Sequence, residues 1–152
     1  MKGIFVSLAL ASAMLGIAAA GQGDPGPSTY YVQLIRGSDR NEPPQPGSRR
    51  VGAKLAERFN SVFRFQNYWE VGRREVAVAR GYRAKVRLNN EREVEIDLRS
   101  PQLRRVTTYQ NGQPVQRVSR PTGEAMTIMG GNHDAKSVWF IVVRRDKPPI
   151  AD

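Results

Sequence analysis

Apolar and polar residues alternate along most of this chain in short runs, and turn-forming residues separate the runs. Alternation with a period of two is typical of strands that bury one face, and closely spaced turns are typical of sandwiches and barrels. The pattern predicts strands near Thr29–Arg36, Asn67–Val71, Arg74–Ala79, Tyr82–Leu88, Arg92–Leu98, Arg104–Gln110, Pro114–Ser119, Glu124–Met129 and Ser137–Arg145. Asn111-Gly112 is the clearest turn signal, because both residue types tolerate the positive φ of a two-residue hairpin turn.

One segment, Ser48–Arg64, has helical periodicity instead. Its apolar residues fall on one stripe of a helix, and Ser48 is a suitable N-cap because its hydroxyl can accept a hydrogen bond from the first turn. The stripe consists of Val51, Leu55, Phe59, Val62 and Phe63. A Pro- and Gly-containing loop, Gly37–Gly47, precedes this segment.

These elements predict the α+β class: a mostly antiparallel β sandwich or open barrel with one amphipathic helix packed on the sheet. The sequence does not distinguish the sandwich from the barrel. We expect a single β-rich domain over residues 29–147 and a short C-terminal tail over residues 148–152. One domain of this size can bury a hydrophobic core.

One hairpin has a predictable register. Val94 and Ile96 alternate with acidic residues in the second strand, and the first strand alternates apolar with basic residues over positions 83–87. A loop at Asn89-Asn90-Glu91 would pair Val86 with Val94 and would place the basic residues opposite the acidic ones. A shift by one residue would set apolar side chains against carboxylates, so this register is favoured. Carboxylates paired in this way stay ionised and suit neither a general acid nor a raised-pKa base.

The N-terminus has the pattern of a secretory signal peptide. Lys2 is followed by an apolar run, and Ala18-Ala19-Ala20 supplies small residues for cleavage. We therefore expect a signal peptide over residues 1–20, a flexible leader over residues 21–28, no transmembrane span in the mature protein, and a periplasmic or secreted location in a bacterium. The sequence contains no Cys, which excludes disulfides, thiol catalysis and thiolate metal sites.

Charge is the strongest compositional feature. The formal net charge is +10, and it falls to +9 when Lys2 is removed with the signal peptide. Arginine dominates the basic residues, and its planar guanidinium suits carboxylates and phosphates. We expect an exported, non-catalytic binding or accessory module that favours an anionic envelope polymer or an acidic protein surface. An ordinary solvated surface would explain the same charge.

The basic residues expected to face such a partner share the helical segment and the later strands. They are Arg49, Arg50, Lys54, Arg58, Arg104, Arg105, Arg144 and Arg145, with Arg117 and Arg120 as further contributors to the surface. Nucleic acid binding by the aromatic and basic stretch Arg64–Trp69 is disfavoured by the export signal, and these aromatics are expected to anchor the helix on the sheet. The sequence does not specify an oligomeric state.

Candidate chemistry is sparse. Gly131-Asn132-His133-Asp134 resembles one block of the two-metal phosphoesterases, but His133 is the one histidine of the chain and the other blocks are missing. We interpret Gly130-Gly131-Asn132 as a turn, and we expect no metal, no cofactor and no catalytic residue. The alternative function is a hydrolase acting on an envelope polymer.

The cleavage pattern gives the first testable prediction. The exported protein should begin at Gly21 or within about two residues of it, because signal peptidase requires small residues such as Ala18 and Ala20. N-terminal sequencing or the intact mass of the exported protein would measure this. A membrane-bound product that retains Met1 would contradict the prediction.

Overall fold

A computed structural model of the protein describes residues 26–134 and 137–149, with side chains described outside residues 131–137. The predicted signal peptide, most of the leader and the end of the tail lie outside the described residues. The described elements are β1 (Ser28–Ser38), β2 (Arg49–Arg50), α1 (Ala53–Asn60), β3 (Asn67–Val78), β4 (Arg83–Arg87), β5 (Arg92–Asp97), β6 (Leu103–Gln110), β7 (Gln113–Pro121), β8 (Met126–Asp134) and β9 (Ser137–Arg144).

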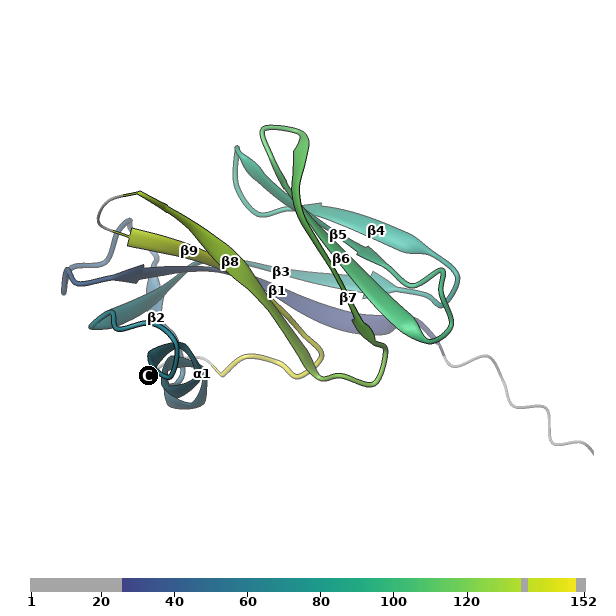
Figure 1. The fold of residues 1–152 in the computed structure, drawn as a ribbon, viewed down its shortest axis with the longest axis horizontal. Coiled ribbons are helices and arrows are strands. Elements are labelled where there is room, and N and C mark those ends of the chain that lie inside the picture. Colours follow the sequence, from purple (N-terminus) through teal and green to yellow (C-terminus); the bar gives the residue numbers. More distant parts are fainter. Residues whose placement is uncertain (1–25, 135–136, 150–152) are drawn as a thin grey trace, which may run out of the picture.

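The strands form two open antiparallel sheets. The larger sheet has the order β2-β3-β1-β9-β8, and the smaller has the order β4-β5-β6-β7. The smaller sheet covers part of one face of the larger sheet, and α1 lies on the opposite face toward the other end (Figure 1). The predicted mostly antiparallel β architecture with one packed helix is confirmed, and the two open sheets make it a sandwich.

Two hydrophobic clusters lie on opposite faces of the larger sheet. The cluster between the sheets joins Val32 and Leu34 of β1 to Val94 and Ile96 of β5. The other cluster joins Ile35 of β1 to side chains of α1 and to aromatic residues on the neighbouring strands. Its members include Leu55, Phe59, Tyr68, Phe140 and Val142, with Phe65 packed against them. Tyr68 and Phe65 therefore anchor the helix on the sheet, as the sequence predicted. Trp69 was expected to do the same but is not part of this cluster, and its ring lies against the guanidinium of Arg50.

The predicted hairpin register is confirmed. Val86 pairs with Val94 and Ala84 with Ile96, and the basic strand β4 runs opposite the acidic residues of β5. The ion pairs are partly diagonal, since Lys85 reaches Glu93 at 3.1 Å. The hydrogen bond from Lys85 and its charge hold the pKa of Glu93 below the usual range, which keeps this carboxylate ionised. The turn at Asn111-Gly112 also has the predicted positive φ values, 49° and 78°.

The helix is shorter than the sequence predicted, and the expected N-cap at Ser48 is wrong. Arg49 and Arg50 form the short edge strand β2 instead, opposite Glu70 and Trp69 of β3. The helix begins after Gly52, which has an extended conformation. Pairing with the exposed edge of β3 outweighs helical propensity here, because propensity is a weak local preference that tertiary contacts readily override.

Two predicted breaks lie inside strands. Strand β3 continues through Gly72, with a register shift opposite Leu34 and Ile35 of β1. Strand β8 continues through Gly130-Gly131-Asn132 to Asp134, so the interpretation of these residues as a turn is wrong. A register shift lies between Gly130 and Asn132, and a Cβ atom at Gly130 would lie 2.6 Å from the carbonyl oxygen of Trp139. Gly130 therefore lies at a β-bulge, and its lack of a side chain allows the backbone of β9 to approach closely.

The end of β5 gives a prediction about stability and pH. Asp97 is buried and accepts hydrogen bonds from the Arg99 side chain at 3.0 and 2.7 Å, and these bonds lower its pKa to about 2. Because the carboxylate is favoured in the folded state, its contribution to stability is present above about pH 4 and disappears as the pH falls through about 2. Asp97→Asn should lower the free energy of unfolding by about 1 kcal/mol at pH 7. The loss is this small because solvent around Arg99 screens the ion pair.

Urea denaturation of the wild type and of Asp97→Asn between about pH 7 and pH 2 would measure this difference. Glu91→Gln is the matched control, because Glu91 is an exposed carboxylate on the preceding loop. A loss that stays constant down to pH 2 would show that the charge of Asp97 does not stabilise the fold.

Candidate anion-binding cavity

A cavity of about 630 Å³ lies on the helix side of the larger sheet. Its walls come from β2, α1, β3, the start of β8 and the segment that follows β9, and Gln33 of β1 also contributes. Small-molecule sites typically enclose about 300–1,000 Å³. The cavity is therefore large enough for a ligand or for a side-chain group of a partner.

Positive charge dominates the lining. The basic residues that line the cavity are Arg49, Arg50, Lys54, Arg58, Arg73, Arg144 and Lys147. Two lining carboxylates oppose them, and each is held by one arginine: Glu70 by Arg73 and Asp146 by Arg144. The other five basic residues form no ion pair with a described carboxylate, so the cavity carries an uncompensated positive charge.

A buried polar group forms one wall. Glu70 lies on β3 and is only 7% exposed, and its carboxylate accepts hydrogen bonds from the Gln33 amide and from Arg73. Arg73 binds it in bidentate geometry, at 2.8 and 2.9 Å. Charge-assisted pairs of this kind fix the orientation of the guanidinium. Glu70 therefore fixes the position of the Arg73 guanidinium in the cavity wall.

The segment after β9 closes one side of the cavity. The guanidinium of Arg73 donates to the carbonyl oxygens of Pro148 and Pro149 at 3.4 Å, and Pro149 packs against Gly52. Asp146 accepts hydrogen bonds from Arg144, and these bonds, the charge of Arg144 and the charge of Arg58 lower its pKa. Asp146 is thus the second carboxylate of the cavity wall, beside Glu70, that is paired with an arginine.

The structure brings together five of the eight residues predicted to face a partner. Arg49 and Arg50 lie on β2, Lys54 and Arg58 on α1, and Arg144 at the end of β9, and all of them line the cavity. Arg50 is also a structural residue, since its guanidinium lies 4.7 Å from the ring centroid of Trp69 and donates to Asn41 at 2.6 Å.

The other three predicted residues lie elsewhere. Arg105 and Arg145 are exposed outside the cavity lining, as are Arg117 and Arg120 on β7. The expectation that Arg104 lies on the surface is wrong, because its side chain is fully buried. It donates to Thr127 at 2.7 Å and to the carbonyl oxygen of Glu124 at 2.9 Å. Arg144 is also buried, at 9% exposure, so its exposure was predicted wrongly as well.

Sequence reasoning did not place five polar residues in this site: Gln33, Glu70, Arg73, Asp146 and Lys147. Gln33 offered a signal, since a polar residue in the middle of an apolar strand is expected to need a buried partner. That partner, Glu70, lies 37 residues away and belongs to a different strand.

Within residues 26–134 and 137–149, no group of three or more His, Cys, Asp or Glu side chains is arranged to hold a metal ion. The side chain of His133 lies outside the described part, so its predicted lack of a metal role is not tested. The helix in the described part of the chain is too short and too polar to cross a membrane.

Comparison with known proteins gives no family model, no curated protein and no solved structure that matches this chain.

The Arg73 contacts generate a prediction about the closing segment. Arg73→Met should loosen residues 146–149, because it removes both hydrogen bonds to the proline carbonyls and leaves Glu70 without its charged partner. Tryptic cleavage after Arg144 or Arg145 should become about tenfold faster under native conditions. The control is Arg74→Met, which removes an exposed arginine from the same strand. Equal cleavage rates in the two variants would contradict the proposed role of Arg73.

Proposed function

We propose that this protein is an exported, non-catalytic binding module whose cationic cavity takes an anionic group from an envelope polymer or from an acidic protein. The observation that carries the proposal is the gathering of seven basic side chains around one cavity. These side chains come from three separate parts of the chain: residues 49–58, residue 73 and residues 144–147. Five of them form no ion pair with a described carboxylate, so charge alone would draw an anion to this place.

The hydrolase alternative gains no support from this cavity. Hydrolysis of a polymer by two carboxylates requires an acid with a raised pKa and a second, ionised carboxylate. The two carboxylates of the cavity are both bonded to arginine, and the pKa of Asp146 is lowered. Binding without chemistry is the function that this geometry favours.

Arg49→Glu combined with Lys54→Glu tests the proposal. Both side chains are exposed at the cavity and make no described hydrogen bond, so their replacement should leave the fold intact. Binding to defined heparin fragments, and separately to polyglutamate, should weaken by at least about tenfold at about 50 mM salt. Wild-type binding should fall steeply as salt rises, because each neutralised charge releases a counterion.

The matched control is Arg64→Glu combined with Arg80→Glu, which makes the same change in net charge at exposed positions outside the cavity. This control should bind nearly as well as the wild type. If both double variants lose affinity equally, the binding depends on net charge and the cavity is not the site. If the wild type binds neither polyanion at low salt, the positive charge only keeps the surface solvated and the proposal is wrong.

A further inference from the structure

The two open sheets of the sandwich end in four edge strands, and three of these edges are protected. Strand β4 carries Arg83, Lys85 and Arg87. Strand β2 is only two residues long, and the part of β3 that continues the same edge carries Arg73, Arg74 and Glu75. Strand β7 contains two prolines and two arginines: Pro114, Arg117, Arg120 and Pro121. Charged residues, prolines and short length are the usual features that prevent an edge strand from pairing with another chain.

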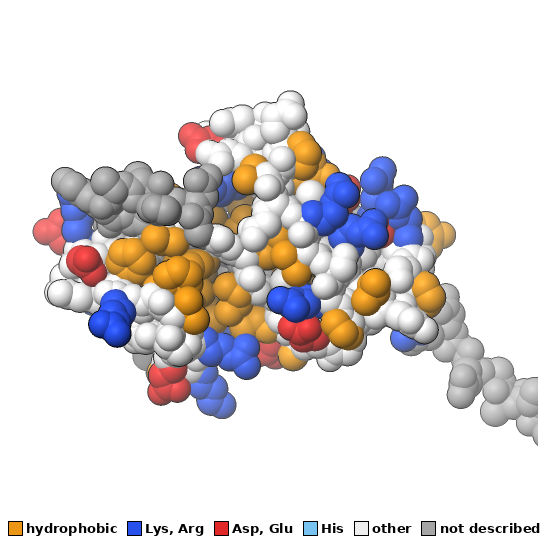
Figure 2. All heavy atoms as spheres, viewed as in Figure 1, with side chains coloured by type: hydrophobic (Ala, Val, Ile, Leu, Met, Phe, Trp, Pro, Cys, Tyr) orange, Lys and Arg blue, Asp and Glu red, His pale blue; other side chains and the backbone are white. Residues whose placement is uncertain are grey.

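The edge of β8 lacks these features. It pairs with β9 on one side, and no described strand pairs with its other side. Its first five residues, Met126–Gly130, include neither a charged residue nor proline, and Ile128 is 37% exposed. Figure 2 shows hydrophobic side chains in a broken band across this side of the molecule, between α1 and the two sheets. An unpaired strand of this composition offers free backbone donors and acceptors to an extended segment.

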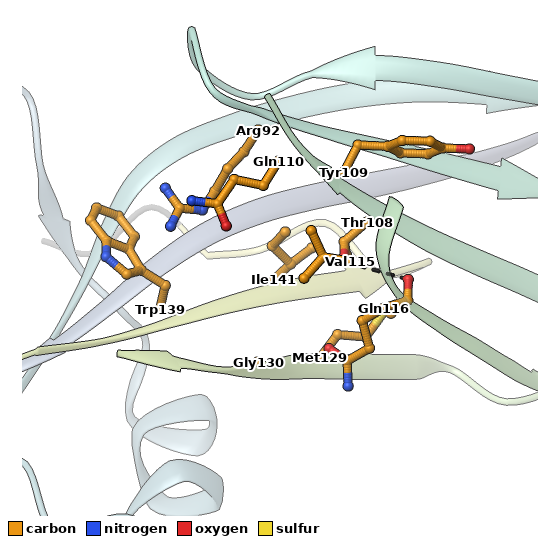
Figure 3. A pocket seen from close by; sticks show the side chains of 10 residues that line it. All are labelled: Arg92, Thr108, Tyr109, Gln110, Val115, Gln116, Met129, Gly130, Trp139 and Ile141. Atoms are coloured by element: carbon orange, nitrogen blue, oxygen red, sulfur yellow. Dashed lines mark hydrogen bonds between the residues drawn. The ribbon is translucent and has the colours of Figure 1, made fainter. Parts of the chain in front are cut away.

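A second cavity lies along this edge. It has a volume of about 400 Å³ and lies between the sheets, where β6 and β7 on one side face β8 and β9 on the other (Figure 3). Apolar side chains, Val115, Met129 and Ile141, line it together with the polar Thr108 and Gln116, and Arg92 and Trp139 form one end. The sandwich is thus left open beside its one unprotected edge.

A strand added to β8 would pair with its free edge and would also place side chains in the cavity between the sheets. Side chains of a strand alternate between two faces, so every second residue of an added strand would point toward the cavity. Strand addition takes affinity from the backbone and specificity from such pockets. The remaining residues would lie on the helix side of the sheet, where the guanidinium of Arg58 lies 3.9 Å from the sulfur of Met126.

The positive charge of the chain indicates which kind of molecule would pair with β8. A second copy of this chain, paired through β8 around a twofold axis, would bring two molecules of strongly positive charge together. Arg58, whose guanidinium lies beside Met126 of this edge, would come with each copy. An acidic segment instead meets opposite charge on the helix side. We propose that the edge of β8 binds an extended acidic peptide of a partner protein, with small apolar side chains in the cavity between the sheets.

The probe for this proposal is a synthetic peptide of about nine residues in which valine alternates with glutamate. Two matched peptides share its length: one has lysine in place of glutamate, and one has the same composition with the valines and the glutamates in separate blocks. Fluorescence anisotropy with the intact protein should show the alternating acidic peptide binding at least about tenfold more tightly than either. Amide hydrogen exchange should slow over residues 126–130.

Two variants locate the binding. Ile128→Glu should weaken the acidic peptide about tenfold through like-charge repulsion, and Val115→Phe should weaken it by filling the cavity. Tyr82→Glu is the control, because it makes the same charge change at a residue that is 68% exposed in the turn between β3 and β4. Equal loss in Ile128→Glu and Tyr82→Glu, or slowed exchange only at residues outside β8, would overturn the proposal. A dimer of the wild type would also overturn it, if amide exchange in β8 is slow without peptide and Ile128→Glu dissociates the dimer. The molecule bound to β8 would then be a second copy of this chain.

Discussion

The larger sheet has to be covered on both faces, because its central strand β1 carries apolar side chains on each of them. Tyr30, Val32 and Leu34 point toward the smaller sheet, whereas Ile35 points toward α1. The register shift beside Leu34 and Ile35 lies where β1 passes from one covered region to the other. Without either cover, several large apolar side chains would meet water, at a cost of about 25 cal/mol for each Å².

The cationic cavity follows from the same constraint. An eight-residue helix is about 12 Å long, whereas the outer strands of a five-stranded sheet lie about 19 Å apart. The helix therefore leaves part of its face of the sheet open, and the segment after β9 closes only one side of the remaining space. Seven basic side chains line this space, and two of them, Arg73 and Arg144, are bonded to carboxylates in its wall.

The strands were predictable where partners lie close in the sequence. The hairpin of β4 and β5 follows from alternation and charge alone, because a shift by one residue would bury carboxylates. Other features depend on distant partners. Arg49 and Arg50 are strand residues because β3 offers them an edge, and Arg104 is buried because Glu124 and Thr127 satisfy its guanidinium. Five residues of the cavity could be selected from charge. Four of them lie close together in the sequence, but Arg144 joins them only because β1 pairs with both β3 and β9.

That pairing also determines when the fold can form. Strand β1 begins at Ser28 and its neighbour β9 ends at Arg144, so the centre of the larger sheet joins the two ends of the domain. Contacts between such distant segments close late, because the loop entropy has to be overcome before they stabilise the fold. A chain whose last strand has not yet emerged therefore cannot complete its core. For a protein threaded through a membrane pore before folding, as the N-terminal pattern predicts, this topology itself would keep the chain open until its passage is nearly finished.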